Sequence, residues 1–353
     1  MTPKTKDSSK IDRVQEFSEE ELELINTLQI APRISWVDAG RILGRHPTTL
    51  AHRWEQLRST GAAWITAHIL GDPREMVVTF HDVRCIPSER QRVAEALCSI
   101  EEIATVDECS WKKDFMLTVF SPSSGWVHRN LTPQLDAIPG ILQHQTAYST
   151  ALHADARAWT VGALSRTQIQ QLRSLAKHQR SGSSSLPANF ADILRILAQD
   201  GRSTAKEIAD ATGLSLTTAR RRLQRILDSS ALAIRCDVAQ APAGYPMACH
   251  WYTRLPADQH SEAAKILRQF GALRLCASIT GPSNFMFMFW IRNAAEVGDI
   301  ERMLASRLPE LQIAESTVIS HIAKRMGWRL SEQGTATGEV LIPGFEWSLP
   351  TRS

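Results

Sequence analysis

Apolar residues recur at intervals of three and four along a stretch in the second half of the chain. They are Leu216, Ala219, Leu223, Ile226 and Leu227. This spacing places them on one face of a single helix, for which Ser215 is a favourable N-cap. A helix that ends at Gly213 comes before it, and an earlier helix is built around Ile193, Leu194 and Leu197. The pattern therefore predicts three short helices with a shared core.

The same trihelical pattern occurs near the start of the chain. The segments 24–62 and 193–231 align without gaps at a shift of 169 residues. Aligned pairs are Leu28 with Leu197, Gly44 with Gly213, Thr48 with Thr217, Thr49 with Thr218, and Arg53 with Arg222. In the first segment Pro47 stands at the first position of the third helix, where its fixed φ is favourable. Such self-similarity indicates a duplicated domain.

A strand-rich stretch follows each trihelical unit. In the second copy the expected order is strand 246–254, helix 257–270, strands 273–280 and 284–291, helix 294–308 and strand 311–321. In the first copy it is strand 75–84, helix 88–98, strands 103–109 and 114–120, helix 127–135 and strand 141–149. The order βαββαβ predicts a ferredoxin-like sandwich, with two helices on one face of a four-stranded sheet.

The predicted fold class is therefore α+β, with two tandem copies of a winged-helix-like helix-turn-helix domain, each followed by a ferredoxin-like domain. The helix-turn-helix domains are expected at 18–70 and 187–240, and the ferredoxin-like domains at 74–152 and 244–325. The segment 153–186 is expected to join the copies, helical in its first part and flexible around the Ser- and Gly-containing stretch 181–185. The tails, 1–17 and 326–353, are expected to be loosely ordered.

Both faces of the predicted sheets are apolar. Along 284–291, Phe285, Phe287 and Phe289 alternate with Met286, Met288 and Trp290. Two helices cover only one face, and an exposed apolar face would aggregate. The simplest cover is a second sheet of the same kind. We therefore expect the two α/β domains to pair within the chain as a pseudo-dimer; an ordinary core strand beneath an unpredicted segment is the alternative.

Charge changes this picture only locally. The formal net charge is +3, which says little about partners, but 201–235 holds seven Lys and Arg against three Asp and Glu. An α-helix fits the major groove of DNA, and Arg221 points most directly away from the apolar face of the third helix. The candidate DNA-binding residues of the second copy are Thr217, Thr218, Arg220, Arg221, Arg222, Gln224 and Arg225. A soluble bundle with an Arg-rich surface is the alternative, but recurrence of the unit favours DNA binding.

The first copy has a weaker signal for binding the phosphate backbone. Its matching residues are Thr48, Thr49, His52 and Arg53. Glu55 would face the polyanion, so this helix is expected to read bases but to hold the backbone less firmly. A mainly structural role for the first unit is the alternative.

Several other classes of site have no support in the sequence. The six cysteines contain no CxxC pair and are expected to be reduced and mostly buried. The eleven histidines form no ligand-spaced cluster, so no metal is predicted. No Gly-rich phosphate loop, GxSxG elbow or paired catalytic carboxylate stands out, so no catalytic residue or cofactor is predicted. No signal peptide or membrane span is recognised, and a cytoplasmic protein is expected.

The order of these motifs resembles the Lrp/AsnC (feast/famine) family of bacterial and archaeal transcription regulators, duplicated within one chain. Thr280 and Gly281 match the Thr-Gly of the family's hairpin signature, while Asn284 replaces its Asp. Gly244-Tyr245 resembles the dipeptide that opens the family's first strand. In the first copy Asp114 is kept and Trp111 stands where Gly is expected. The resemblance covers about residues 18–325.

The resemblance implies a regulator that binds double-stranded DNA and, through its α/β domains, a small effector such as an amino acid or a related metabolite. Thr280, Gly281 and Asn284 are the candidate ligand-binding residues, since Gly281 permits close approach of the backbone to a small carboxylate. A turn that is merely tight is the alternative. Trp111 is expected to fill the equivalent space in the first copy. Homodimers or larger assemblies are expected.

An enzyme is the alternative function. Siroheme decarboxylases also resemble two Lrp-like halves, and they tend to carry an Arg-Arg-Phe-Gly-Ala-like stretch before the first strand and a His/Arg set that holds the substrate. The corresponding region here, 229–245, has Arg235 as its only basic residue. The sequence therefore favours a regulator without enzymatic activity.

Overall fold

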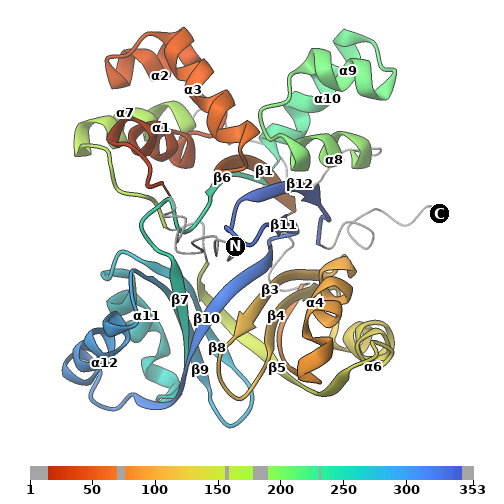
Figure 1. The fold of residues 1–353 in the computed structure, drawn as a ribbon. Coiled ribbons are helices and arrows are strands. Elements are labelled where there is room, and N and C mark those ends of the chain that lie inside the picture. Colours follow the sequence, from red (N-terminus) through yellow and green to blue (C-terminus); the bar gives the residue numbers. More distant parts are fainter. Residues whose placement is uncertain (1–14, 70–75, 156–158, 178–189, 230–231, 344–353) are drawn as a thin grey trace, which may run out of the picture.

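The computed structural model describes residues 15–69, 76–155, 159–177, 190–229 and 232–343 (Figure 1). Two groups of helices lie at one end of the molecule, and the large sheet with its own helices lies at the other. A short two-stranded sheet stands between these parts. The predicted α+β class, with helix-turn-helix and ferredoxin-like parts, is confirmed.

Each helix-turn-helix unit has the three predicted helices. In the first copy they are α1 (Glu19–Ile30), α2 (Trp36–Leu43) and α3 (Pro47–Ser59); in the second they are α8 (Ala191–Gln199), α9 (Ala205–Thr212) and α10 (Leu216–Asp228). The Ser215 hydroxyl accepts a hydrogen bond from the backbone N–H of Thr218, and Gly213 ends α9 with φ 68°. These local signals therefore set the helix ends as expected.

One residue that was expected on the buried apolar face of α10 is not buried. Ala219, Leu223 and Ile226 are buried and Leu227 is half-buried, but the side chain of Leu216 is 46% exposed. Leu216 belongs to the first turn of α10, which projects beyond the core of its unit. The position is therefore available to a partner rather than to the core.

A strand that was not predicted follows the third helix of each unit, α3 in the first and α10 in the second. β1 (Ala63–Ile69) and β6 (Leu232–Val238) pair antiparallel, from Ala63 opposite Val238 to Ile69 opposite Leu232. We call this two-stranded sheet the platform. It joins the two copies, since β1 belongs to the first and β6 to the second.

The two α/β modules have the predicted βαββαβ order. The first comprises β2 (Val77–Cys85), η1 (Pro87–Glu89), α4 (Arg90–Ser99), β3 (Ile103–Cys109), β4 (Phe115–Ser121), α5 (Ser124–Trp126), η2 (Val127–Leu131), α6 (Thr132–Asp136) and β5 (Ile141–Ala154). The second comprises β7 (Met247–Arg254), η4 (Ala257–Gln259), α11 (His260–Arg268), β8 (Leu273–Ile279), β9 (Phe285–Ile291), α12 (Ala295–Arg307) and β10 (Gln312–Arg325). Each forms a four-stranded antiparallel sheet, as a ferredoxin-like sandwich requires.

The strands of the two modules join edge to edge. β5 pairs with β8, and β10 pairs with both β3 and β7, so that eight strands form a closed ring. Phe80 and Met116 of the first module share one buried cluster with Tyr252 and Met286 of the second. The face of each sheet that its helices leave uncovered is therefore covered by the other sheet, and no edge of the ring is left unpaired.

Charged side chains also join the modules. The Lys113 ammonium lies 2.7 Å from a carboxylate oxygen of Asp82 in its own module and 3.2 Å from one of Glu315 in the other. His250 Nε2 of β7 lies 3.1 Å from Asp107 Oδ2 of β3, and both side chains are almost fully buried. This buried contact thus joins the two modules inside the closed ring.

The C-terminal prediction was wrong for 328–340. This part forms β11 (Trp328–Leu330) and β12 (Ala336–Val340), which extend the sheet from β10. The Trp328 indole lies 5.8 Å from the Trp64 ring, and its Nε1 donates to the Thr66 hydroxyl at 3.0 Å. The segment was mistaken for a tail because its strands are short, whereas a tertiary contact with the platform holds them.

The segment between the copies is helical where it was expected to be. Its helix α7 (Arg166–Lys177) packs against α1 and α2. The backbone N–H of Leu164 donates to the Asn26 side chain at 3.1 Å. The expected flexible stretch at 181–185 lies outside the described residues. The six cysteines are buried, as predicted.

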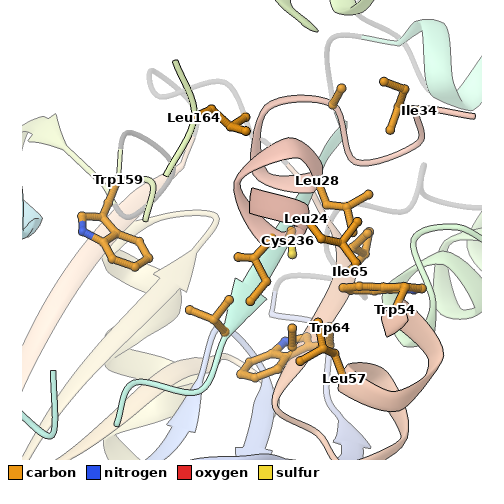
Figure 2. Close-up of a cluster of buried hydrophobic side chains, with 14 of the residues drawn as sticks. Leu24, Leu28, Ile34, Trp54, Leu57, Trp64, Ile65, Trp159, Leu164 and Cys236 are labelled. Atoms are coloured by element: carbon orange, nitrogen blue, oxygen red, sulfur yellow. The ribbon is translucent and has the colours of Figure 1, made fainter. Parts of the chain in front are cut away.

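The core of the first helix-turn-helix unit is shared with the second copy. Figure 2 shows Leu24, Leu28, Trp54 and Leu57 of its helices gathered near Trp64 and Ile65 of β1 and Cys236 of β6. The second unit in turn has Ala67 of β1 in its core. Each unit therefore completes its core with a strand of the other copy.

Acid is expected to destabilise the fold through His81. Its ring nitrogens are hydrogen-bonded to the hydroxyls of Thr79 and Thr146, at 2.9 and 3.0 Å. Burial, with a smaller contribution from His144, lowers the pKa of His81 to about 4. The unfolded chain, with an ordinary histidine pKa near ~6.5, then binds a proton that the folded chain excludes. The free energy of unfolding therefore keeps its full value above the unfolded pKa of ~6.5. It falls as the pH drops from there towards about 4, the pKa of His81 in the folded chain.

The measurement is the free energy of unfolding in urea at pH 7 and pH 5.5. Between them the wild-type chain should lose roughly 1 kcal/mol more than His81→Gln, which cannot take up the proton. The comparison concerns the pH dependence alone, because the substitution has its own cost at pH 7. Equal pH dependence in the two proteins would refute this role of His81.

Candidate DNA-binding site

The candidate residues of the second copy lie along one face of α10. Five of them are exposed: Thr217, Arg220, Arg221, Gln224 and Arg225. Thr218 and Arg222 are half-buried beside them. The opposite face of the helix is buried through Ala219, Leu223 and Ile226. The structure thus brings all seven predicted residues to one helix and directs most of them into solvent.

The arginines of α10 are electrostatically available. Within the part of the chain that the structure describes, none of the four at 220, 221, 222 and 225 has an acidic partner within ion-pair distance. On this face the Gln224 side-chain amide donates a hydrogen bond to a carboxylate oxygen of Asp228 at 2.9 Å. Unpaired guanidinium groups on an exposed helix are suited to phosphates and to the O6 and N7 atoms of guanine.

The candidate residues of the first copy lie on α3 and present less free positive charge than those of α10. Thr48, Thr49 and His52 are exposed, whereas Arg53 is half-buried. Arg53 forms an ion pair with Glu20 of α1. This pairing neutralises the one basic residue among the four candidates.

The neighbouring cations of the first copy are paired as well. Arg45, in the turn before α3, lies 2.8 Å from a carboxylate oxygen of Glu20. Within α3, Arg58 lies 2.7 Å from Glu55. The two recognition helices thus differ in the charge they present, and the acidic residues of α1 account for part of the difference.

α3 and α10 lie at the same end of the molecule (Figure 1). Each leads into one strand of the platform, and these strands are antiparallel. An antiparallel pair has a local two-fold axis between its strands, so the two units are related by an approximate two-fold rotation. This is the relation between the two halves of a palindromic DNA site.

The candidate ligand-binding residues lie together in the turn between β8 and β9, where their polar groups already have partners. The Thr280 hydroxyl accepts a hydrogen bond from the Tyr148 N–H at 2.9 Å. The Asn284 amide accepts from the Leu255 N–H at 3.0 Å and donates to the Leu255 carbonyl at 2.8 Å. Gly281 has φ 115°, a backbone angle that residues with a side chain rarely adopt.

The equivalent turn of the first copy has similar hydrogen bonding. A carboxylate oxygen of Asp114 accepts from the Cys85 N–H at 2.8 Å, as Asn284 does from Leu255. Trp111 is 61% exposed, so the expectation that it fills the equivalent space is wrong. Lys112 takes the positive φ of this turn instead, and the indole projects into solvent.

Sequence reasoning missed a buried charged cluster between the platform and the closed ring. Asp237 of β6 accepts a hydrogen bond from Arg235. Burial alone would raise the pKa of Asp237, but Arg235, Arg325 and Arg274 hold it below its ordinary value, with a contribution from His68. Nε of Arg235 and both Nε and Nη1 of Arg325 have no hydrogen-bond partner among the described residues.

Aromatic rings complete this cluster. The Arg274 guanidinium lies 3.9 Å from the centre of the Trp290 ring and 4.7 Å from that of Trp159. Arg325 lies 5.0 Å from the Trp64 ring. Cation–π contacts of this kind stabilise a desolvated guanidinium. In the sequence, this cluster is visible only as basic and aromatic residues within strands. Their neighbours in the sequence do not indicate that these residues come into contact.

Two further findings bear on the kind of site. Among the described residues, no group of three or more His, Cys, Asp and Glu side chains is placed to hold a metal ion. No helix in these same residues is long and apolar enough to cross a membrane.

Comparison with known proteins gives one family match and several similar proteins. Residues 192–228, which contain α9, α10 and most of α8, match the family described as winged helix-turn-helix DNA-binding. The HTH-type transcriptional regulator FL11 of Pyrococcus horikoshii is 24% identical over 115 residues, which are 32% of this chain and 76% of FL11.

Solved structures resemble the chain in fold. The siroheme decarboxylase NirDL, in co-complex with an iron-uroporphyrin III analogue, has a TM-score of 0.50 at 14% identity, covering 93% of this chain and 96% of its own. E. coli AsnC has a TM-score of 0.33 at 16% identity, covering 38% of this chain and 93% of its own. The chain thus contains a winged helix-turn-helix DNA-binding domain at 192–228 and, with its two copies of a trihelical unit and a βαββαβ module, resembles the Lrp/AsnC family as a tandem duplication.

Proposed function

We propose that the chain is a sequence-specific regulator of transcription that binds double-stranded DNA through α10 and α3. The observation that carries the proposal is the exposed face of α10, whose arginines are unpaired among the described residues. It belongs to the segment that matches winged helix-turn-helix DNA-binding domains. Guanidinium groups on such a face bind base edges and phosphates.

The two recognition helices have different tasks in this proposal. α10 supplies most of the phosphate contacts, because Arg220, Arg222 and Arg225 are free of acidic partners among the described residues. α3 reads bases through Thr48, Thr49 and His52 with little contribution from charge. The preferred DNA site is then an imperfect palindrome, with half-sites about one helical turn or a multiple apart.

The α/β modules form the regulatory part in this proposal. They act as a pseudo-dimer within the chain, a role that the strand pairs β5–β8 and β3–β10 support. A small effector, an amino acid or a related metabolite, modulates DNA binding through this part. The protein acts in the cytoplasm and assembles into homodimers or larger oligomers.

DNA binding is tested by selection from a random duplex library with the purified full-length chain. Enriched sites should contain two related but unequal half-sites. Their affinity, measured by fluorescence anisotropy, should fall steeply with salt, since each phosphate contact releases counterions. If no sequence is enriched over the starting library, the proposed function is wrong.

The turn between β8 and β9 is the proposed effector site, and Gly281→Trp is its test. A thermal-shift screen with amino acids and related small acids should find a compound that raises the unfolding temperature. Gly281→Trp should abolish this shift while the protein stays folded, because a residue with a side chain rarely adopts φ 115° and the backbone N–H groups that face the ligand would turn away from it. A variant that unfolds at the wild-type temperature and keeps the full shift would place the effector elsewhere.

A siroheme-decarboxylase-like enzyme is the second candidate, since NirDL matches nearly the whole chain in fold. The basic residue of the region before β7, Arg235, is 9% exposed and ion-paired with Asp237. It is therefore occupied within the fold rather than free for a substrate carboxylate. The absorption spectrum after incubation with siroheme separates the two candidates: a retained, shifted tetrapyrrole band after gel filtration would favour the enzyme.

A further inference from the structure

The two helix-turn-helix units are joined through each other's strands. β1 and β6 pair along their whole length. α1 of the first copy packs on β6 of the second, and α8 of the second packs on β1 of the first. A shift of one unit against the other would therefore open both cores at once.

A reciprocal pair of arginines reinforces this junction. Arg33, in the loop between α1 and α2, donates hydrogen bonds to the carbonyl oxygens of Gly201 and Ser203 in the loop between α8 and α9, the second at 2.9 Å. Arg202 stands at the equivalent position of the repeat, 169 residues after Arg33. The two side chains thus have matching places in the two copies.

Arg202 makes the reverse contacts. It donates to the carbonyl oxygens of Pro32 and Ile34, each at 2.8 Å, and its guanidinium lies 4.1 Å from the centre of the Trp36 ring. Burial, and after it the repulsion of Arg33, lowers the pKa of Arg202 to about 10, so that the side chain stays charged at neutral pH. A planar guanidinium that donates to two acceptors fixes their direction as well as their distance.

The loop that receives Arg33 leaves no room for movement towards the platform. The Gly201 N–H donates to the Ile65 carbonyl of β1 at 2.7 Å. A Cβ at position 201 would lie 2.5 Å from the Ile65 side chain, so the two copies approach as closely as a glycine allows. The second unit is thus held against β1 at its first loop, and its recognition helix is held with it.

We propose that Arg33 and Arg202 are positioning residues that fix the separation and the angular phase of α3 and α10, so that the chain binds two half-sites at one spacing only. This inference rests on the proposed DNA-binding function. Any change in the distance between the helices must break the guanidinium–carbonyl hydrogen bonds and disturb the β1–β6 ladder. Two base pairs inserted at the centre of a site rotate one half-site by about 70° and move it by about 7 Å, which a rigid pair of readers does not follow.

The test compares spacing tolerance in the wild-type chain and in the double variant Arg33→Ala, Arg202→Ala. A site enriched from a random duplex library by the wild-type chain is remade with one to five base pairs inserted at its centre, and affinities are measured by anisotropy at fixed salt. The wild-type chain should lose about tenfold or more in affinity with two inserted base pairs. The double variant should bind the original site more weakly but lose less than about threefold on the same insertion.

Arg302→Ala is the matched control. It removes one arginine from the exposed surface of α12, where Arg302 pairs with Asp299, and it should keep the strict spacing of the wild type. Thermal unfolding by circular dichroism shows whether the double variant is folded. If it is not, the double variant Arg33→Lys, Arg202→Lys replaces it, since it keeps the charge but loses the second hydrogen bond of each side chain.

The outcomes separate this inference from the function on which it rests. Failure to enrich any DNA would refute the proposed function and the inference with it. Three results would overturn the inference alone: an enriched site with a single half-site, a wild-type chain that tolerates the insertions, or a folded double variant as strict as the wild type. A merely structural role for the arginines would lower the unfolding temperature without changing the spacing tolerance.

Discussion

Arg221→Ala is expected to weaken binding to the enriched DNA site by about 1–3 kcal/mol, the contribution of a good bidentate contact with a guanine. Arg221 is exposed, lies opposite the buried face of α10, and has no acidic partner among the described residues that would compete with DNA. The loss should be concentrated at one base position, because a contact with a base edge carries sequence information and a phosphate contact does not.

His52→Ala is the matched comparison for Arg221→Ala, since both side chains are exposed at the centre of a recognition helix. It should cost less, because α3 presents little free positive charge while Arg53 is paired with Glu20. Anisotropy titrations at one salt concentration measure both variants. Equal losses would mean that the two helices contribute alike, against the asymmetry that the ion pairs indicate.

Asp237→Ala is expected to lower the free energy of unfolding by about 3–5 kcal/mol, the cost of leaving a buried charge without its partner. Asp237 is 3% exposed and accepts a hydrogen bond from Arg235. Arg325 and Arg274 also face it, and removing its carboxylate leaves the three guanidinium groups to repel one another in a medium that screens them weakly.

Urea unfolding followed by tryptophan fluorescence measures this loss, because Trp64 and Trp290 lie beside Arg325 in the same cluster. Asp299→Ala is the control. It removes an exposed carboxylate that pairs with Arg302, and such pairs contribute at most about 1 kcal/mol. Similar losses in the two variants would show that the buried cluster does not depend on Asp237.

The helices and the strand order of the modules were predictable because their signals are local. Ser215 begins α10 and Gly213 ends α9 through hydrogen bonds and backbone angles within a few residues. The strands follow alternating side chains, whose period of two is set by the extended backbone. The exposed arginines of α10 followed from the same periodicity, since a buried apolar face leaves the opposite face in solvent.

The platform was not predictable in this way. β1 and β6 belong to different copies, and their side chains are buried by helices of both. Within the described residues, each strand has its only strand partner in the other copy, so no hairpin or turn signal next to it in the sequence indicates the pairing. The strands β11 and β12 were not predicted for a related reason. They are held by the contact of Trp328 with the platform and by strand pairing that extends from β10, which the local sequence does not show.

The sequence by itself determined that the chain has two copies of one unit, where the helices of each copy begin and end, and which recognition helix has the basic residues. Only the tertiary structure decided that the copies complete each other's cores, that Arg33 and Arg202 hold the two units together, and that Arg53 is neutralised by Glu20. The physical reason is range. Caps and periodicity act between neighbours in the chain, whereas ion pairs and strand pairs depend on which distant residues the closed core brings within a few ångströms.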